Sequence, residues 1–213
     1  RLDAAGRLAF SRLALPGTSG RLTGEFPFTS QGSTISELLA SFAGAGRIKA
    51  EGFAVSAAEA GAVARVLKRP ANELQPLDEN RIGSLLEQEM RNGTLALPAL
   101  SMPITIIGGV ARISAPAFET GGGTERAQVL PSLVIDLPRA QYEARIGLRL
   151  ANPPPQWRGA LPETALSWSG RVGLPPGAPR RVLSVSSLLN GLLAIHLQRD
   201  LETIEGFEAD NRE

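Results

Sequence analysis

The sequence contains no cysteine and a single histidine, His196. The absence of cysteine excludes disulfide bonds and thiolate metal ligands, and one imidazole is too few for a typical zinc site. It does not assign a cellular compartment, because proteins without cysteine occur both in the cytosol and in the bacterial envelope.

Net charge and aromatic content are also low. The formal net charge is +1, so the chain lacks the basic surface that nucleic-acid binding requires. Two tryptophans and one tyrosine are too few for a platform on which bases stack. With 43% hydrophobic and 20% charged residues, the composition is that of a globular protein rather than a disordered one.

No hydrophobic run is long enough to cross a bilayer. The most hydrophobic stretch, Leu95 to Val110, is broken by Pro98, Pro103 and Gly108–Gly109, whereas a membrane-spanning helix needs about 20 apolar residues. The N-terminus lacks the basic and apolar segments of a signal peptide. Because the sequence begins at Arg1 rather than Met, we expect a fragment or processed product whose anchor or signal lies outside it.

The sequence shows no recognisable catalytic constellation. His196 is expected on a leucine-rich helix, where a histidine is more often a surface residue than a general base. No serine lies in a Gly-x-Ser-x-Gly motif. Glu202, Glu205 and Glu208 recur at helical spacing, which favours a solvated stripe over a metal site. Gly121–Thr124 lacks the lysine of a phosphate-binding loop and is expected to form a hairpin tip. We therefore predict no enzymatic activity, no metal and no cofactor.

The chain does contain a series of segments in which hydrophobic residues alternate with polar or small ones. A period of two is typical of half-buried β-strands. Gly108–Gly109 fits a hairpin turn, a bulge or a close approach of two backbones. Pro175–Pro179 is expected to form the last turn of the chain. The expected strands cover residues 8–15, 21–29, 47–55, 104–113, 133–137, 142–150, 166–174 and 182–185.

Four segments show the period of an amphipathic helix. Three of them lie in the first half of the chain, over Thr34–Phe42, Ser56–Leu67 and Asp78–Met90. Each begins at a residue that can cap a helix, and in the first two a glutamate three residues later completes a capping box. The fourth begins at Ser186 or Ser187 and runs almost to the end, with leucines on one side and charges on the other.

Consecutive strands joined by turns favour an antiparallel meander. We therefore predict a β-rich α+β fold. It consists of a curved, mostly antiparallel sheet, short helices near the N-terminal half and a long C-terminal amphipathic helix. Residues 1–213 are expected to form one region, and the loop expected over Arg69–Pro76 supplies a candidate sub-boundary at 70–76.

The hydrophobic face of the sheet has two interpretations. The helices cover it as an ordinary core, or part of it stays open as a groove for an apolar ligand. Because alternate residues of a strand lie on the same face, the sequence shows which residues share the hydrophobic face. It does not show whether that face is an open groove or a closed core. The candidate lipid-binding residues on this face are Phe26, Phe28, Ile104, Ile106, Ile135, Ile146, Leu148 and Trp168.

The C-terminal sequence from Leu166 reads LSWSGRVGLPPGAPRRVLSVSSLLNGLLAIHLQRDLETIEGFEADNRE. It resembles the C-terminal end of alphaproteobacterial AsmA-family proteins. In that family a Leu-x-x-Ser-Gly strand leads through a proline-rich turn to Arg-Arg-x-(Leu/Val)-x-Val-x-x-Leu and a final helix. Here these elements are Leu166–Gly170, Pro175–Pro179, Arg180–Leu188 and Leu189–Glu213.

Two upstream segments extend the resemblance over most of the chain. Thr29–Val55 is similar to the family unit in which a helix and a glycine-rich connection lead into a strand. Pro103–Leu150 resembles its strand–strand unit, with Gly109-Val110 and Ile135-Asp136-Leu137 in the expected order. All of these are structural patterns, and none carries a catalytic residue.

The resemblance implies a cell-envelope protein. AsmA-like proteins are generally anchored in the inner membrane by an N-terminal helix, with their bulk in the periplasm. They are related to bridge-like lipid-transfer proteins, whose curved sheets present a hydrophobic groove to phospholipid acyl chains. This chain is therefore expected to contribute such a groove to phospholipid transport and outer-membrane assembly, without binding nucleic acid. The alternative is a structural or protein-interaction module with a closed core and no lipid ligand.

The C-terminal helix also has two interpretations. It caps the open end of the sheet, since exposed edges invite aggregation, or it docks on an envelope protein partner. Helices that lie on membranes are usually rich in lysine or arginine on the polar face. From Arg199 onward this helix carries more acidic than basic residues, which disfavours direct binding to an anionic membrane.

Overall fold

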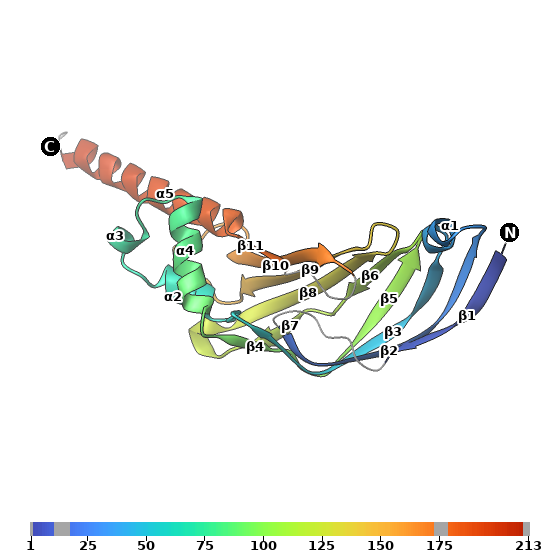
Figure 1. Ribbon diagram of the computed structural model, residues 1–213. Helices are drawn as coiled ribbons and strands as arrows, with labels where there is room; N and C mark the ends of the chain where they lie inside the picture. The colour runs from blue at the N-terminus through green and yellow to red at the C-terminus, as the bar shows by residue number, and fades with distance from the viewer. Residues whose placement is uncertain (1, 11–17, 173–178, 211–213) are drawn as a thin grey trace.

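The chain folds into one long, curved antiparallel sheet with helices gathered near its ends (Figure 1). The computed structural model describes residues 2–10, 18–172 and 179–210. Successive hydrogen-bonded neighbours give the order β1-β2-β3-β5-β6-β8-β9-β10-β11, so the sheet does not close on itself. The short strands β4 and β7 pair with β3 and β8, respectively.

Within the described residues the elements follow one another as an antiparallel meander interrupted by helices. The strands are β1 (Leu2–Phe10), β2 (Thr18–Gly32), β3 (Ala43–Ser56), β4 (Thr94–Ala96), β5 (Leu100–Ile107), β6 (Val110–Ser114), β7 (Phe118–Thr120), β8 (Ala127–Asp136), β9 (Gln141–Leu150), β10 (Glu163–Arg171) and β11 (Arg180–Ser184). The helices are α1 (Ile35–Ala40), α2 (Ala62–Leu67), α3 (Ala71–Leu74), α4 (Glu79–Met90), the 3₁₀ turn η1 (Gly123–Glu125) and α5 (Ser186–Asp210). The predicted fold class is confirmed.

The predicted strands correspond to real strands, most of them longer than expected. The predicted strand over 8–15 overlaps β1, but its residues 11–15 lie outside the described residues. The same holds for residues 173–174 of the strand predicted over 166–174 and for most of the predicted turn at Pro175–Pro179. Gly108–Gly109 forms the two-residue hairpin turn between β5 and β6. Both glycines have positive φ, +58° and +75°, which such a turn requires and which most side chains avoid.

Helices α2 and α4 lie at one end of the sheet (Figure 1). They bury apolar residues such as Val66, Ile82 and Leu86 against the hydrophobic core. As predicted, Asp78 caps α4, since its Oδ1 accepts a hydrogen bond from the Arg81 backbone N–H at 2.8 Å. The sheet residues and the residues of α2 and α4 belong to one continuous hydrophobic cluster.

An ion-pair network ties these helices together. Glu89 of α4 accepts hydrogen bonds from Arg69 at 2.7 Å and from Arg65 of α2 at 2.8 Å. These bonds, the one from Arg69 foremost, hold the pKa of the Glu89 carboxyl below its usual range. Arg65 also reaches Glu125 of η1 at 3.0 Å, so the network links the helices to the turn that precedes β8.

The structure corrects three details of the helix predictions. The helix predicted from Ser56 begins only at Ala62, because β3 continues through Ser56 and pairs there with Thr94 of β4. The Arg69–Pro76 loop contains the short helix α3. Ile35, predicted on the buried side of its helix, is 79% exposed.

Helix α1 lies at the other end of the sheet, near the N-terminus (Figure 1). The predicted cap is present, because Thr34 Oγ1 accepts a hydrogen bond from the Glu37 backbone N–H at 3.2 Å. The buried Ser30 of β2 donates its hydroxyl to the Leu38 carbonyl at 2.5 Å, which fixes α1 on the sheet. Phe42, just after the helix, stacks on Phe28 with ring centroids 4.9 Å apart.

Among the described residues, helix α5 packs on the body through its first turns. Leu188 and Leu192 are buried in the core, and the indole of Trp157 lies against Gly191. Beyond them the helix projects away from the sheet (Figure 1), and Leu197, Leu201 and Ile204 are 62%, 59% and 54% exposed. The predicted long C-terminal helix is confirmed.

Candidate functional site

Cross-strand register aligns hydrophobic residues of successive strands into rows across the concave face. Residues directly opposite each other in an antiparallel pair lie on the same side of the sheet. One row runs through Ile104, Ile113, Leu133, Ala144 and Trp168. A second row runs through Phe28, Gly44, Ile106, Ala111, Ile135 and Tyr142. The apolar surface is therefore continuous from β2 to β10.

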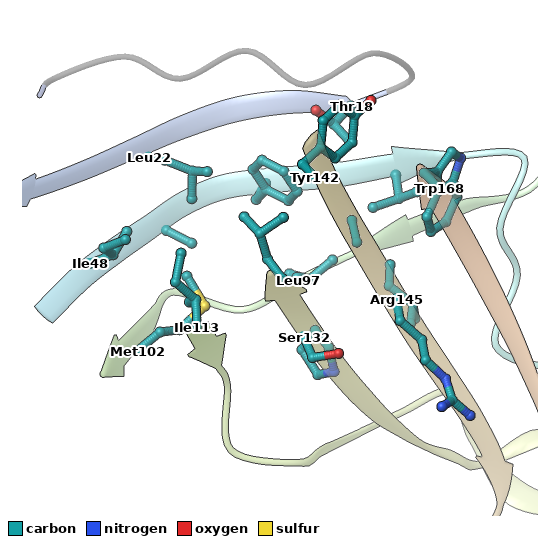
Figure 2. A pocket seen from close by; sticks show the side chains of 17 residues that line it. Thr18, Leu22, Ile48, Leu97, Met102, Ile113, Ser132, Tyr142, Arg145 and Trp168 are labelled. Carbon is teal, nitrogen blue, oxygen red and sulfur yellow. The ribbon is translucent and has the colours of Figure 1, made fainter. Parts of the chain in front are cut away.

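An apolar cavity of about 100 Å³ lies between the arms of the curved sheet. Figure 2 shows Leu22 of β2 and Ile48 of β3 on one side of it and Tyr142 of β9 and Trp168 of β10 on the other. Leu22 and Ile48 are buried, whereas Tyr142 and Trp168 are half-buried, so solvent reaches part of the wall.

Besides the tyrosine and the tryptophan, three of the described residues around the cavity have polar side chains: Thr18, Ser132 and Arg145. Ser132 and Arg145 pair across β8 and β9, and they alternate with the inward-facing Leu133 and Ala144. Figure 2 shows the guanidinium of Arg145 pointing away from the hydrophobic side chains. The cavity thus offers dispersion contacts and few hydrogen bonds.

The eight candidate lipid-binding residues all lie on this concave face. Two of them, Ile146 and Trp168, line the cavity. Phe28 and Ile135 are half-buried beside it in the second row. The remaining four are tightly buried with exposures of 0–4%; they are Phe26, Ile104, Ile106 and Leu148. Strand parity placed the residues on one face, and the structure divides them between cavity wall and packed core.

Sequence reasoning missed other wall residues, including Phe53 and Val55. In β3 the inward-facing positions change from even numbers, such as Ile48, to odd ones, such as Phe53. The cause is a bulge, where the register between β2 and β3 shifts between Ser19 and Arg21. Gly20 and Gly52 have positive φ there, +113° and +57°, and glycine inside a strand pattern is the sequence signal of such a bulge.

The polar candidates His196 and Glu202 occupy exposed positions, whereas the side chains of Glu205 and Glu208 lie outside the described part of the structure. The His196 side chain is 50% exposed, and its Nε2 lies 3.8 Å from Asp200 one turn away on α5. Gln198 donates a hydrogen bond to Glu202 at 2.9 Å. Among the described residues no three histidine or acidic side chains gather to hold a metal ion. Lys68 donates a hydrogen bond to Thr124 at 2.8 Å, which holds the glycine-rich turn against α2.

Comparison with known proteins found no matching protein-family model, no matching curated protein and no matching solved structure. Within the described residues, no helix is both long enough and apolar enough to span a membrane.

Proposed function

We propose that this chain is a non-enzymatic segment of a cell-envelope protein that contributes a hydrophobic β-trough to phospholipid transport between the inner and outer membranes. The proposal combines the resemblance to AsmA-family sequences with one structural observation. That observation is the apolar cavity of about 100 Å³, which lies on a continuous hydrophobic face of an unclosed sheet. In this proposal the trough faces the periplasm, and an anchor outside these residues holds the protein at the inner membrane.

The size of the cavity limits what it accommodates. A cavity of about 150 Å³ with a comparable lining holds one benzene molecule. The present cavity is somewhat smaller, so it takes a few methylene groups rather than a whole acyl chain. Each buried methylene contributes roughly 0.8 kcal/mol, which suits a lipid that binds transiently and moves on.

The second candidate function is a scaffold with a closed core, which binds an envelope protein partner through α5. The tight burial of Phe26, Ile104, Ile106 and Leu148, at 0–4% exposure, favours it. So does the exposed apolar stripe of Leu197, Leu201 and Ile204, which packs on nothing in the described part of the chain. In this case the cavity is a packing defect, and adding lipid leaves the protein unchanged.

A cavity-filling substitution separates the two functions. Ala144 lines the cavity between Leu133 and Trp168, so Ala144→Leu fills it with an apolar side chain. Filling a cavity commonly stabilises a protein by about 0.5–2 kcal/mol, so lost binding would not reflect unfolding. Ala45→Leu is the matched control, because Ala45 is exposed on the convex face of β3.

The readout is native mass spectrometry of detergent-free protein incubated with liposomes. The transport proposal predicts bound phospholipid in the wild type and in Ala45→Leu, and its loss in Ala144→Leu. A wild-type protein that stays free of lipid would favour the scaffold.

A further inference from the structure

Arg181 is a positively charged residue on the concave face, beside the apolar cavity. It lies in the edge strand β11 directly opposite Trp168, and Trp168 lines the cavity. Opposite residues of an antiparallel pair share a face, so Arg181 extends the row of Ala144 and Trp168 to the edge of the sheet. Its side chain is 29% exposed and therefore stands at the margin between cavity and solvent.

The side chain of Arg181 reaches from β11 to α4 and to the turn that follows β3. One amino group donates to the Ala57 carbonyl at 3.1 Å, and the other lies 3.3 Å from Oε1 of Glu87 in α4. Ala57 follows Val55, another cavity-lining residue, by two positions. The Arg181 side chain thus joins the edge strand beside Trp168 to the chain that leaves the end of β3, close to the cavity-lining residues Trp168 and Val55.

One hydrogen-bond donor of this side chain has no partner. The Nε–H of Arg181 is buried and finds no acceptor among the described residues. Buried donors in proteins are nearly always satisfied, and an exception calls for an explanation such as an absent ligand. Arginine presents its N–H groups as a planar fork that matches a carboxylate or a phosphate.

The existing ion pair with Glu87 does not block such a ligand. The Glu87 side chain is 54% exposed, and ion pairs this close to water contribute little to stability. Glu87 pairs with one amino group and not with the Nε–H, so an anion can accept from the Nε–H while the bond to the Ala57 carbonyl continues to orient the guanidinium.

We propose that Arg181 binds the acidic group of an amphiphile whose hydrocarbon chain passes Trp168 into the cavity. The ligand class is an acyl chain that ends in a carboxylate or carries a phosphate. This inference rests on the proposed function, because it assigns a headgroup contact to the same cavity. It adds the requirement that the ligand carry a negative charge, which binding to an apolar trough alone does not impose.

The test compares ligands that share a chain and differ in charge. Dodecanoate is titrated below its micellar concentration and 1-dodecanol below its solubility limit, with tryptophan fluorescence as the readout. Phosphatidic acid and diacylglycerol are offered in liposomes, with capture measured by native mass spectrometry. The pair that shows the charge preference identifies whether the bound group is a carboxylate or a phosphate.

Two substitutions with opposite expected effects address Arg181. Arg181→Gln weakens binding of the acidic ligand about tenfold or more and leaves the affinity for the neutral ligand unchanged. Glu87→Gln removes the carboxylate that competes with the acidic ligand for Arg181, and it should strengthen binding of that ligand. Because this variant leaves Arg181 intact, it still tests the inference if Arg181→Gln folds poorly. Arg180→Gln, which removes the same charge from the neighbouring exposed position, leaves both affinities unchanged.

The outcomes separate the two proposals. Equal binding of acidic and neutral ligands by the wild type overturns the role of Arg181 and leaves the apolar trough standing. Equal weakening of both ligands by Arg181→Gln, with no gain in Glu87→Gln, makes Arg181 a structural bridge only and also overturns the inference. A wild type that binds none of the four ligands overturns the proposed function as well.

Discussion

Replacing Gly191 of α5 by alanine should destabilise the protein, although it improves the helix. A glycine inside a helix costs about 1 kcal/mol relative to alanine, so propensity alone predicts a gain. A Cβ at this position would overlap Cη2 and Cζ2 of Trp157. Trp157 is only 7% exposed, and its indole N–H donates to the Ala160 carbonyl at 2.7 Å, so the ring has little freedom to move.

The gain in helix propensity and the cost of the clash with Trp157 together determine whether the substitution stabilises or destabilises the protein. Forcing extra volume into a packed site costs about 1–3 kcal/mol, and loss of the indole hydrogen bond adds roughly 1 kcal/mol. After subtraction of the propensity gain, Gly191→Ala should lower the free energy of unfolding by about 1–3 kcal/mol. For a domain of this size each kcal/mol corresponds to about 2–4 °C in Tm.

Gly83→Ala in α4 is the matched control. Gly83 also lies inside a helix, but a Cβ there meets no atom within 4 Å. This variant should gain about 0.5–1 kcal/mol. Urea unfolding followed by circular dichroism measures both changes. If Gly191→Ala proved as stabilising as Gly83→Ala, the docking of α5 on Trp157 would be wrong.

Two further predictions concern the helices. Glu89→Gln should lower the free energy of unfolding by roughly 1–2 kcal/mol at neutral pH, because two charge-assisted hydrogen bonds are weakened. The folded-state pKa of Glu89 is depressed, so its contribution is complete above the unfolded-state pKa and is lost as pH falls through the folded-state pKa. Urea titrations should show the two proteins converging in acid, and a constant difference would contradict this role. Leu188→Ala should cost about 2–5 kcal/mol because the side chain is fully buried, whereas Leu197→Ala on the projecting part of α5 should change stability by less than about 0.5 kcal/mol. Similar losses at both positions would mean that the distal part of α5 also packs on the body.

Local sequence signals predicted the elements well where the determinants are local. Hydrophobic alternation identified the central strands, and the cap at Asp78 with its apolar stripe fixed the start of α4. The helix predicted to begin at Ser56 was wrong because of a long-range contact. Ser56 has the sequence pattern of a helix cap, but it lies in a strand and pairs with Thr94. Pairing with a distant strand overrides a local capping preference, and the sequence of the segment alone does not reveal it.

In the candidate site, too, the features set by local sequence were predictable and those set by long-range contacts were not. Period-two alternation placed Ile146 and Trp168 on the same face of the sheet, and both line the cavity, because side-chain direction follows from backbone geometry. Parity did not reveal which residues line a cavity, since this depends on how strongly the sheet curves and which strands face each other. Arg181 also escaped detection, because its partners Ala57 and Glu87 are 124 and 94 residues away in the sequence.

Photocrosslinking tests the central claim most directly. A phospholipid with a diazirine near the end of one acyl chain is incubated with the protein, irradiated, and the labelled peptides are mapped by mass spectrometry. The trough proposal predicts labels on cavity-lining residues such as Ile146 and Trp168, and their loss in Ala144→Leu. Labels confined to the exposed stripe of α5, or spread equally over the convex face, would contradict the claim that acyl chains enter the sheet.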